Sequence, residues 1–337
     1  LDGASPYKQA AEAKYKTADA WAKATIERLK GWGFNTIGAW SSKELAQGGI
    51  AYTVNLDLAA KTVPDMWVKA LFPDLFDPAV VEKIQKRAED VCKPLKDDPW
   101  LLGYFLDNEI HWQRDWRSDL SIIEIFLSKL PPESPGHKKA KAFLAARNNN
   151  AEPTEDDKQA FMELCAKEYF RICHEAVRKV DANHMILGCR FAGTGPELVL
   201  AAMKDHVDIA SANYYQFPSP TEKLQRIHEL TGRPVMLTEF SFKAMDSGLP
   251  NTKGGGRPLR TQEQRAALFE SWALSLSKAK FVVGYHWFQY ADQPRQGRFD
   301  GENNNYGMVK IDDSPWEALT ERMKRVNAKT EQLHAGK

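Results

Sequence analysis

The chain alternates between stretches with helical periodicity and short apolar runs. Six stretches carry apolar residues on one helical face, which predicts amphipathic helices. These stretches are residues 10–30, 78–95, 158–179, 196–204, 221–231 and 261–280. Seven shorter runs are mostly continuous in apolar residues, which predicts strands that are buried on both faces. These runs are residues 34–40, 50–58, 101–106, 185–191, 208–215, 235–240 and 281–288.

Most of the predicted strands are followed by a helix, and this alternation is typical of a parallel sheet. The sequence therefore predicts an α/β protein with a (β/α)8 TIM-barrel fold, formed by one domain over residues 1–337. Residues 110–156, which contain two short helical patterns, are expected to form an inserted excursion. Because the first predicted element is a helix, we expect the first barrel strand to lie upstream of Leu1.

Composition excludes several classes of function. The 46 Lys and Arg residues nearly balance the 45 Asp and Glu residues, and a net charge of +1 argues against nucleic-acid binding. No apolar stretch approaches the length of a transmembrane helix, so we expect no membrane insertion. The four cysteines have neither disulfide-framework nor zinc-site spacing, and they are expected to be free, mostly buried thiols.

Two predicted strands end in a glutamate. Glu109 follows the run 101–106, and Glu239 stands near the end of the run 235–240. A carboxylate directly after apolar residues is costly to bury unless it has partners or a role. Either residue alone could form a strand-end salt bridge. Together, at the same end of one barrel, they match the carboxylate pair that cleaves glycosidic bonds.

Aromatic and polar side chains also gather at the predicted strand ends. Trp40, Tyr214, Tyr215 and Trp287 could stack on sugar rings, or they could simply cover the barrel core. The polar candidates for sugar binding are Asn55, Asn108, Arg190, Asn213, His286 and Gln289. Two of these residues could instead have a structural role: Arg190 could form an ion pair, and His286 could be a core histidine.

Several segments resemble a known family. The segment LGYFLDNE at residues 102–109 is similar to the acid/base strand of clan A glycoside hydrolases. The segments TEFSFKAMDSG at 238–248 and GYHWFQYADQP at 284–294 resemble the nucleophile strand and the last strand of the family 50 agarases. GRFDGEN at 297–303 continues this likeness. One departure is Ser241, where the family pattern more often has histidine.

The resemblance implies a retaining β-glycosidase. Glu109 would be the general acid/base and Glu239 the nucleophile, while Asn108 would bind the sugar 2-hydroxyl. Either Tyr214 or, preferably, Tyr215 would donate a hydrogen bond to the nucleophile. Trp287 would form the floor of the subsite that holds the attacked sugar. The chemistry implies no cofactor and no metal.

Two further segments bear on the substrate. His111, Trp112 and Trp116 are expected to wall off one end of the cleft, which would favour cleavage from chain ends. The glycine-rich segment 253–258 is either a flexible wall of the cleft or a plain surface connection.

The expected substrate is a galactose-containing polysaccharide or oligosaccharide of the agar type. Another β-linked glycan, such as a β-glucoside or a glycan with uronic acids, is the alternative for an enzyme. A non-catalytic carbohydrate-binding barrel is the alternative from another class. Because polysaccharides do not enter cells intact, we expect a secreted or periplasmic bacterial protein; the sequence does not indicate its oligomeric state.

Overall fold

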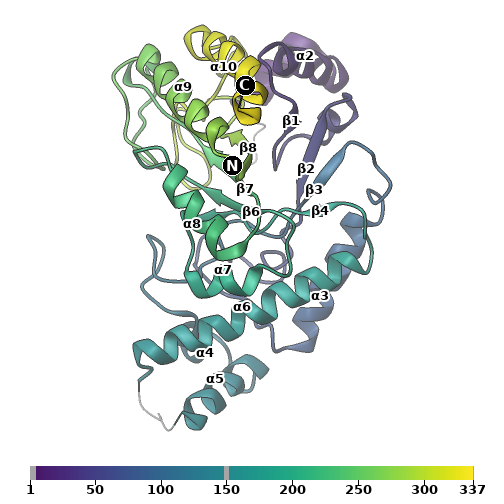
Figure 1. The fold of residues 1–337 in the computed structure, drawn as a ribbon, viewed down its shortest axis with the longest axis vertical. Coiled ribbons are helices and arrows are strands. Elements are labelled where there is room, and N and C mark those ends of the chain that lie inside the picture. Colours follow the sequence, from purple (N-terminus) through teal and green to yellow (C-terminus); the bar gives the residue numbers. More distant parts are fainter. Residues whose placement is uncertain (1–4, 148–151, 337) are drawn as a thin grey trace. The chain divides into compact units, whose positions relative to one another are not determined.

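The computed structural model describes residues 5–147 and 152–336. Strands and helices alternate along most of this part of the chain (Figure 1). The strands are β1 Thr36–Ile37, β2 Ala51–Asn55, β3 Leu101–Phe105, β4 Met185–Ile186, β5 Phe191–Ala192, β6 Ala210–Asn213, β7 Val235–Phe240 and β8 Val282–Trp287. The α-helices are α1 Pro6–Tyr15, α2 Ala18–Gly31, α3 Pro78–Cys92, α4 Ile122–Lys129, α5 Pro135–Ala146, α6 Glu155–Arg178, α7 Glu197–Met203, α8 Thr221–Thr231, α9 Gln262–Lys278 and α10 Glu317–Ala335.

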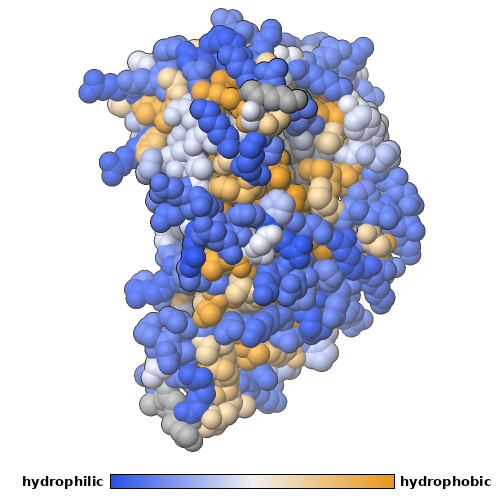
Figure 2. All heavy atoms as spheres, viewed as in Figure 1, coloured by the Kyte–Doolittle hydropathy of each residue, from blue (hydrophilic) through white to orange (hydrophobic). Residues whose placement is uncertain are grey.

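The strands form two four-stranded sheets in chain order, β1-β2-β3-β4 and β5-β6-β7-β8. Pairing is parallel between β1 and β2, between β3 and β4, and between β7 and β8. The predicted α/β class with parallel strands is confirmed, and closure of these strands into a (β/α)8 barrel stays a prediction. Most of the surface visible in Figure 2 is hydrophilic. No helix in the described residues is both long and apolar enough to cross a membrane.

The predicted apolar runs all contain strands, but one run is broken. Residues 185–191 give β4 and the start of β5, which are separated by backbone in the left-handed region at Gly188 and Arg190. A side chain at Gly188 would lie 2.8 Å from the hydroxyl of Ser211, so glycine permits this close approach. The eight strands therefore correspond to seven predicted runs. Residues 5–35 contain helices and no strand.

The helix predictions needed two corrections. Residues 10–30 belong to two helices rather than one, because Lys16 has a φ of 67° and Thr17 caps the second helix. The final helix, α10, was missed by sequence analysis. Its buried Leu319, Met323 and Val326 are spaced by four and three residues, which is the periodicity that would have revealed it.

The chain divides into two compact units. Unit 1 comprises Leu1–Tyr52, Asn213–Gln225 and Val235–Lys337, and unit 2 comprises Thr53–Ala212 and Arg226–Pro234. Strands β1, β7 and β8 belong to unit 1, and β3, β4 and β5 belong to unit 2. Each unit has its own buried apolar residues.

The core of unit 2 is rich in aromatic rings. The long helix α6 packs on α3 and α7 and supplies several of these rings, including Phe161, Tyr169 and Phe170 (Figure 1). The indole of Trp112 stacks on Phe170 with 5.9 Å between ring centroids. All four cysteines are free and buried, as the sequence predicted.

The core of unit 1 is centred on the end of β7. The ring of Phe240 packs against Phe269, Trp272 and Trp287, with centroid distances of 5.3–6.1 Å. Arg265 of α9 is fully buried below them and donates to the backbone carbonyl of Phe242 at 2.6 Å. This arrangement ties α9 to the residues that follow β7, so the end of β7 is held from two sides.

A buried carboxylate joins α1 and α2 to the segment before α10. Asp313 accepts hydrogen bonds from Tyr7 at 2.9 Å, Lys14 at 2.8 Å, Tyr15 at 2.6 Å and Arg28 at 3.0 Å. Burial of Asp313 acts to raise its pKa, but these four donors outweigh burial and lower the pKa to about 2.

We expect the substitution Asp313→Asn to destabilise the protein by about 3 kcal/mol, because Arg28 and Lys14 would lose their charge partner. Since the folded pKa is lowered, the stability that Asp313 contributes is complete above about pH 4 and is lost as the pH falls toward about 2. Urea unfolding across this range tests both points. Asp312→Asn, at an exposed neighbour, is the control, and an equal loss in both variants would contradict the prediction.

Candidate active site

A buried carboxylate fixes the end of β3 in unit 2. Asp107 accepts hydrogen bonds from the backbone N–H groups of Ala59 and Ala60, each at 2.9 Å. The hydroxyl of Tyr169 on α6 donates to the same carboxylate at 2.8 Å. The segment that follows β2 is thereby clamped to the end of β3, two residues before Glu109. Sequence analysis did not single out Asp107.

Glu109 lies directly beyond this clamp, with its side chain nearly buried. Its backbone has a φ of 49°, and its N–H donates to the carbonyl of Arg190 at 3.1 Å. The indole N–H of Trp67 donates to Oε2 of Glu109 at 3.2 Å. Asn108 is half-buried at the same strand end. The predicted carboxylate is therefore held by a donor that comes from a loop 42 residues earlier.

Charged side chains support Trp67 from behind. Arg117 places its guanidinium 5.3 Å from the Trp67 ring and also pairs with Asp115 at 2.5 Å. His111 contacts Asp115 at 3.2 Å and the carbonyl of Leu120 at 2.8 Å. Burial acts to raise the pKa of Asp115, but the hydrogen bonds from His111 and Arg117 hold it well below its usual range.

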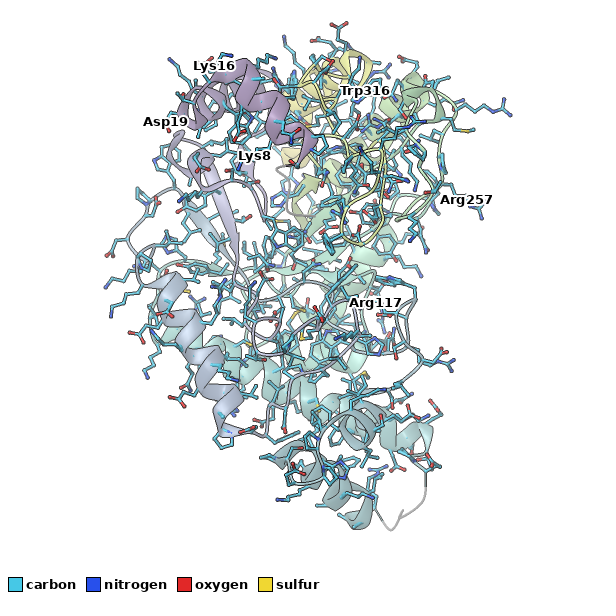
Figure 3. The ribbon with its side chains drawn as sticks, turned by 180° about the vertical axis from the view of Figure 1, so that it is seen from behind. Lys8, Lys16, Asp19, Arg117, Arg257 and Trp316 are labelled. Carbon is cyan, nitrogen blue, oxygen red and sulfur yellow. The ribbon has the colours of Figure 1, made fainter. Side chains whose placement is uncertain are left out.

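These contacts correct one prediction from the sequence. His111 and Trp112 were expected to wall off a sugar cleft, but they are 1% and 4% exposed and belong to the interior of unit 2. Only Trp116 of that group is exposed. The loop that carries all three contains Arg117, which is labelled in Figure 3.

The other predicted residues of unit 2 also lie at strand ends. Nδ2 of Asn55 donates to Asp57 at 2.6 Å, just after β2. Burial raises the pKa of Asp57, and the positive charges of Lys61, Arg87 and Arg190 oppose that effect. Arg190 is buried, with its guanidinium 5.2 Å from the ring of Phe105. The arginine therefore lies against the end of β3 rather than on the surface.

In unit 1, the end of β7 carries the second glutamate. Glu239 is 6% exposed, and the hydroxyl of Tyr215 donates to its Oε2 at 2.6 Å. Tyr214 contacts the same residue through the backbone, since its N–H donates to the Glu239 carbonyl at 2.7 Å. Of the two tyrosines considered from the sequence, Tyr215 is thus the one whose hydroxyl reaches the carboxylate.

The polar candidates of unit 1 have different surroundings. Asn213 is buried, and its Oδ1 accepts from the hydroxyl of Thr238 at 2.8 Å. The amide of Gln289 donates to the carbonyl of Ala291 at 2.9 Å. His286 lies against Gly38, where an added Cβ would be 3.3 Å from Nδ1. Trp40 is about half exposed after β1.

The position of Trp287 differs from the one expected of a sugar platform. Its indole is only 9% exposed, and the indole N–H donates to the carbonyl of Tyr306 at 2.8 Å. The next residue, Phe288, is half-buried and lies beside Tyr215 at 6.4 Å between centroids. Phe288, rather than Trp287, therefore lies beside the tyrosine that donates to Glu239.

The glycine-rich segment packs against Tyr215. A side chain at Gly255 would lie 2.6 Å from Cβ of Tyr215, so only glycine allows this approach. Lys243 holds the segment by donating to the carbonyl of Lys253 at 2.8 Å, and Tyr306 donates to the carbonyl of Gly255. Residues 253–256 therefore support the tyrosine, and the choice between a wall of the cleft and a surface connection stays open.

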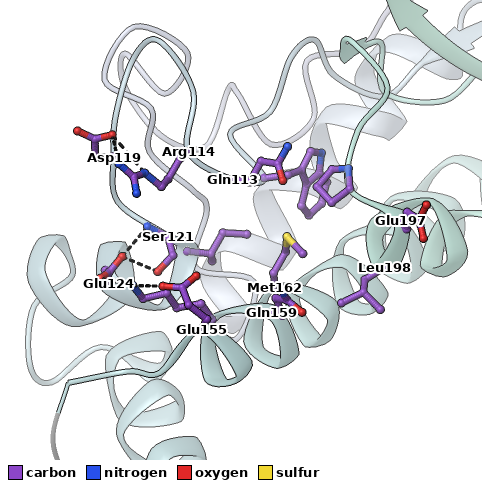
Figure 4. A pocket seen from close by; sticks show the side chains of 14 residues that line it. Gln113, Arg114, Asp119, Ser121, Glu124, Glu155, Gln159, Met162, Glu197 and Leu198 are labelled. Carbon is purple, nitrogen blue, oxygen red and sulfur yellow. Dashed lines mark hydrogen bonds and ion pairs between the residues drawn. The ribbon is translucent and has the colours of Figure 1, made fainter. Parts of the chain in front are cut away.

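A separate pocket of about 730 Å³ lies wholly within unit 2 (Figure 4). None of the predicted catalytic or sugar-binding residues lines it. Its charged side chains pair with each other, as Lys158 does with Glu124 at 3.1 Å and with Glu155 at 3.0 Å. Arg114 and Asp119 pair at 2.8 Å at its edge. These charged side chains of the pocket are thus engaged in ion pairs, and the residues predicted as catalytic lie elsewhere, at the strand ends.

Asp107 predicts a distinct dependence of stability on pH. Burial raises its pKa to about 7, although the backbone donors and Tyr169 oppose the shift. The folded state therefore keeps this proton to a higher pH than the unfolded state, and the stability it contributes is complete below about pH 4. The free energy of unfolding, relative to Asp107→Asn, should fall by up to about 4 kcal/mol as the pH rises through about 7. Urea titrations that give a constant difference would refute this.

Known proteins resemble this chain both in sequence and in structure. No family model matches the chain. The chain is 29% identical to β-agarase B of Vibrio sp. (strain JT0107), over 91% of this chain and 36% of the relative. The solved structure of an agarase matches with a TM-score of 0.80 and 29% identity, over 97% of this chain and 52% of that chain. An exo-β-agarase matches with a TM-score of 0.83 and 29% identity, over 98% and 50%.

The chain thus spans about a third of the length of the curated relatives it matches and about half the length of these solved chains. The structural likeness confirms the α/β fold with parallel strands. The sequence is similar to β-agarases over nearly its whole length.

Proposed function

We propose that the protein is a retaining β-glycoside hydrolase of the agarase type, from family 50 of clan A. The observation that carries this proposal is the nearly buried carboxylate of Glu239 at the end of β7, aimed by the hydroxyl of Tyr215. Similarity to β-agarases over 91% and 93% of the chain supports the substrate class. The proposal requires that units 1 and 2 act as one catalytic domain, because Glu109 and Glu239 belong to different units.

In the first step, Glu239 attacks the anomeric carbon of the galactose and the glycosidic bond breaks. Glu109 gives its proton to the departing oxygen, so the leaving sugar departs as a neutral alcohol. The hydrogen bond that Tyr215 donates to Oε2 orients the carboxylate of Glu239 for this attack. Asn108 directly precedes Glu109, and its place in this motif assigns it the binding of the sugar 2-hydroxyl.

In the second step, Glu109 is a carboxylate and takes a proton from water. The hydroxide equivalent attacks the glycosyl ester, which releases Glu239 and a sugar of the original β configuration. Trp67 donates to Oε2 of Glu109, which helps to hold the carboxylate in place for this step. Neither step uses a metal or an organic cofactor.

The physiological setting follows from the substrate. Agar is too large to cross a membrane intact, so we propose a secreted or periplasmic bacterial enzyme. Hydrolysis of another β-linked glycan would preserve the mechanism and change only the sugar contacts. A carbohydrate-binding protein without activity would need neither glutamate, and the following experiment separates these possibilities.

We expect Glu239→Ala and Glu109→Ala each to lower agarose hydrolysis by about 10³-fold or more, measured as reducing-end release. Azide should rescue both variants on an aryl β-galactoside, with opposite stereochemistry. Without the nucleophile, azide attacks from the vacated face and gives an α-galactosyl azide. Without the acid/base, azide attacks the glycosyl-enzyme and gives the β-azide.

The stereochemistry of rescue makes the assignment decisive. NMR of the azide products identifies which glutamate forms the ester, and exchanged products would reverse the two roles. Wild-type turnover in either variant would refute the mechanism. Binding of agaro-oligosaccharides by an inactive wild-type protein would instead favour the carbohydrate-binding alternative.

Tyr215→Phe removes the hydrogen bond to Glu239 while keeping the ring against Gly255. We expect kcat to fall by about 10²-fold with little change in KM, because the lost donor orients a reacting group. Tyr285→Phe, which removes a hydroxyl that donates to Asn327 at 2.7 Å in the same unit, is the matched control. Equal losses in the two variants would mean that neither hydroxyl has a specific role.

A further inference from the structure

An exposed pair of tryptophans lies next to Glu109 in unit 2. Trp116 is 66% exposed, and its ring meets that of Trp67 edge to face at 6.4 Å between centroids. The indole N–H of Trp67 donates to Glu109. Trp116 therefore presents an exposed indole one ring away from a carboxylate with a proposed catalytic role.

Buried charges hold this pair in place. Arg117 lies 4.7 Å from the ring of Trp116 and 5.3 Å from that of Trp67, so its guanidinium contacts both indoles. Its own position is fixed by Asp115, which contacts His111. Arg117 also donates to the backbone carbonyl of Trp67 at 3.3 Å. A mobile surface tryptophan would need no such support, and its fixed orientation is the property that a stacking surface requires.

We propose that Trp116 and Trp67 form an aromatic ledge that binds the sugar on the leaving-group side of the bond that is cleaved. This inference rests on the proposed function. Sugar rings present C–H faces that stack on indoles, and the ledge offers an exposed indole next to a hydrogen-bonded carboxylate. A neutral sugar also fits the local charge, because Arg117 is already neutralised by Asp115.

The side of the bond follows from the role of Glu109. The general acid must reach the oxygen that joins the two sugars, and after cleavage this oxygen stays with the leaving sugar. A surface anchored to the acid through Trp67 therefore contacts the leaving sugar. The sugar that is attacked must instead lie against Glu239, which accepts a hydrogen bond from Tyr215 in unit 1.

Two substrates with different leaving groups test the ledge. With a neoagaro-oligosaccharide, Trp116→Ala should lower kcat/KM by about 10-fold to 100-fold, the range of one aromatic stacking contact. With a β-galactosyl fluoride, the departing fluoride makes no contact with a ledge, and the loss should be at least several-fold smaller. Trp116→Phe keeps an aromatic face and should recover part of the oligosaccharide activity.

Trp100→Ala provides the matched control. Trp100 is 47% exposed in the same unit, but it precedes β3 and therefore lies at the opposite end of the strand from Glu109. We expect this variant to retain wild-type kcat/KM on both substrates. Thermal unfolding of both alanine variants checks that the fold is kept, as the exposure of both side chains leads us to expect.

The outcomes separate the ledge from the function on which it rests. Equal losses of Trp116→Ala on both substrates, or no loss on either, would overturn the ledge while leaving the hydrolase intact. A wild-type protein that hydrolyses neither substrate would overturn the proposed function and the ledge together. A selective loss on the oligosaccharide, absent from Trp100→Ala, would establish the ledge.

Discussion

The site of unit 1 depends on one hydrogen bond, which the hydroxyl of Tyr215 donates to the carboxylate of Glu239. The hydroxyl of Tyr215 meets the Glu239 carboxylate at 2.6 Å, and the glycine-rich segment packs against the same tyrosine. Gly255 and its neighbours provide that support, at a distance that excludes any side chain. Lys243 in turn holds the glycine segment through backbone carbonyls. The position of the Glu239 carboxylate therefore depends in turn on the tyrosine, the glycine segment and the lysine.

The same physical problem is solved differently at the end of β3. Asp107 is fully buried and relies mainly on backbone N–H groups, whereas Glu109 is nearly buried and receives an indole N–H. Backbone donors are fixed by the fold and make a rigid clamp. The donor to Glu109 comes instead from a side chain, the indole of Trp67. The two carboxylates that follow β3 thus have different surroundings: Asp107 anchors the neighbouring segment, and Glu109 is the proposed acid/base.

The sequence was sufficient for features that local patterns encode. Apolar runs located the strands, and a carboxylate after such a run identified Glu109 and Glu239. It was insufficient where partners are distant in the chain: Trp67 precedes Glu109 by 42 residues, and no spacing rule connects them. The sequence could not decide whether Trp287 or Phe288 lies beside Tyr215. Both residues are aromatic, so the pattern does not show which of them faces the core. The long helix α10 had a readable periodicity and was missed for no physical reason.

The cysteines are distributed unevenly between the two units. Cys92, Cys165, Cys173 and Cys189 all belong to unit 2, all are buried, and unit 1 has none. A thiol reagent can therefore react only when unit 2 opens. The rate of labelling therefore reports the local unfolding of unit 2 and gives no information on unit 1. The four thiols therefore allow the local unfolding of unit 2 to be followed without any engineered probe.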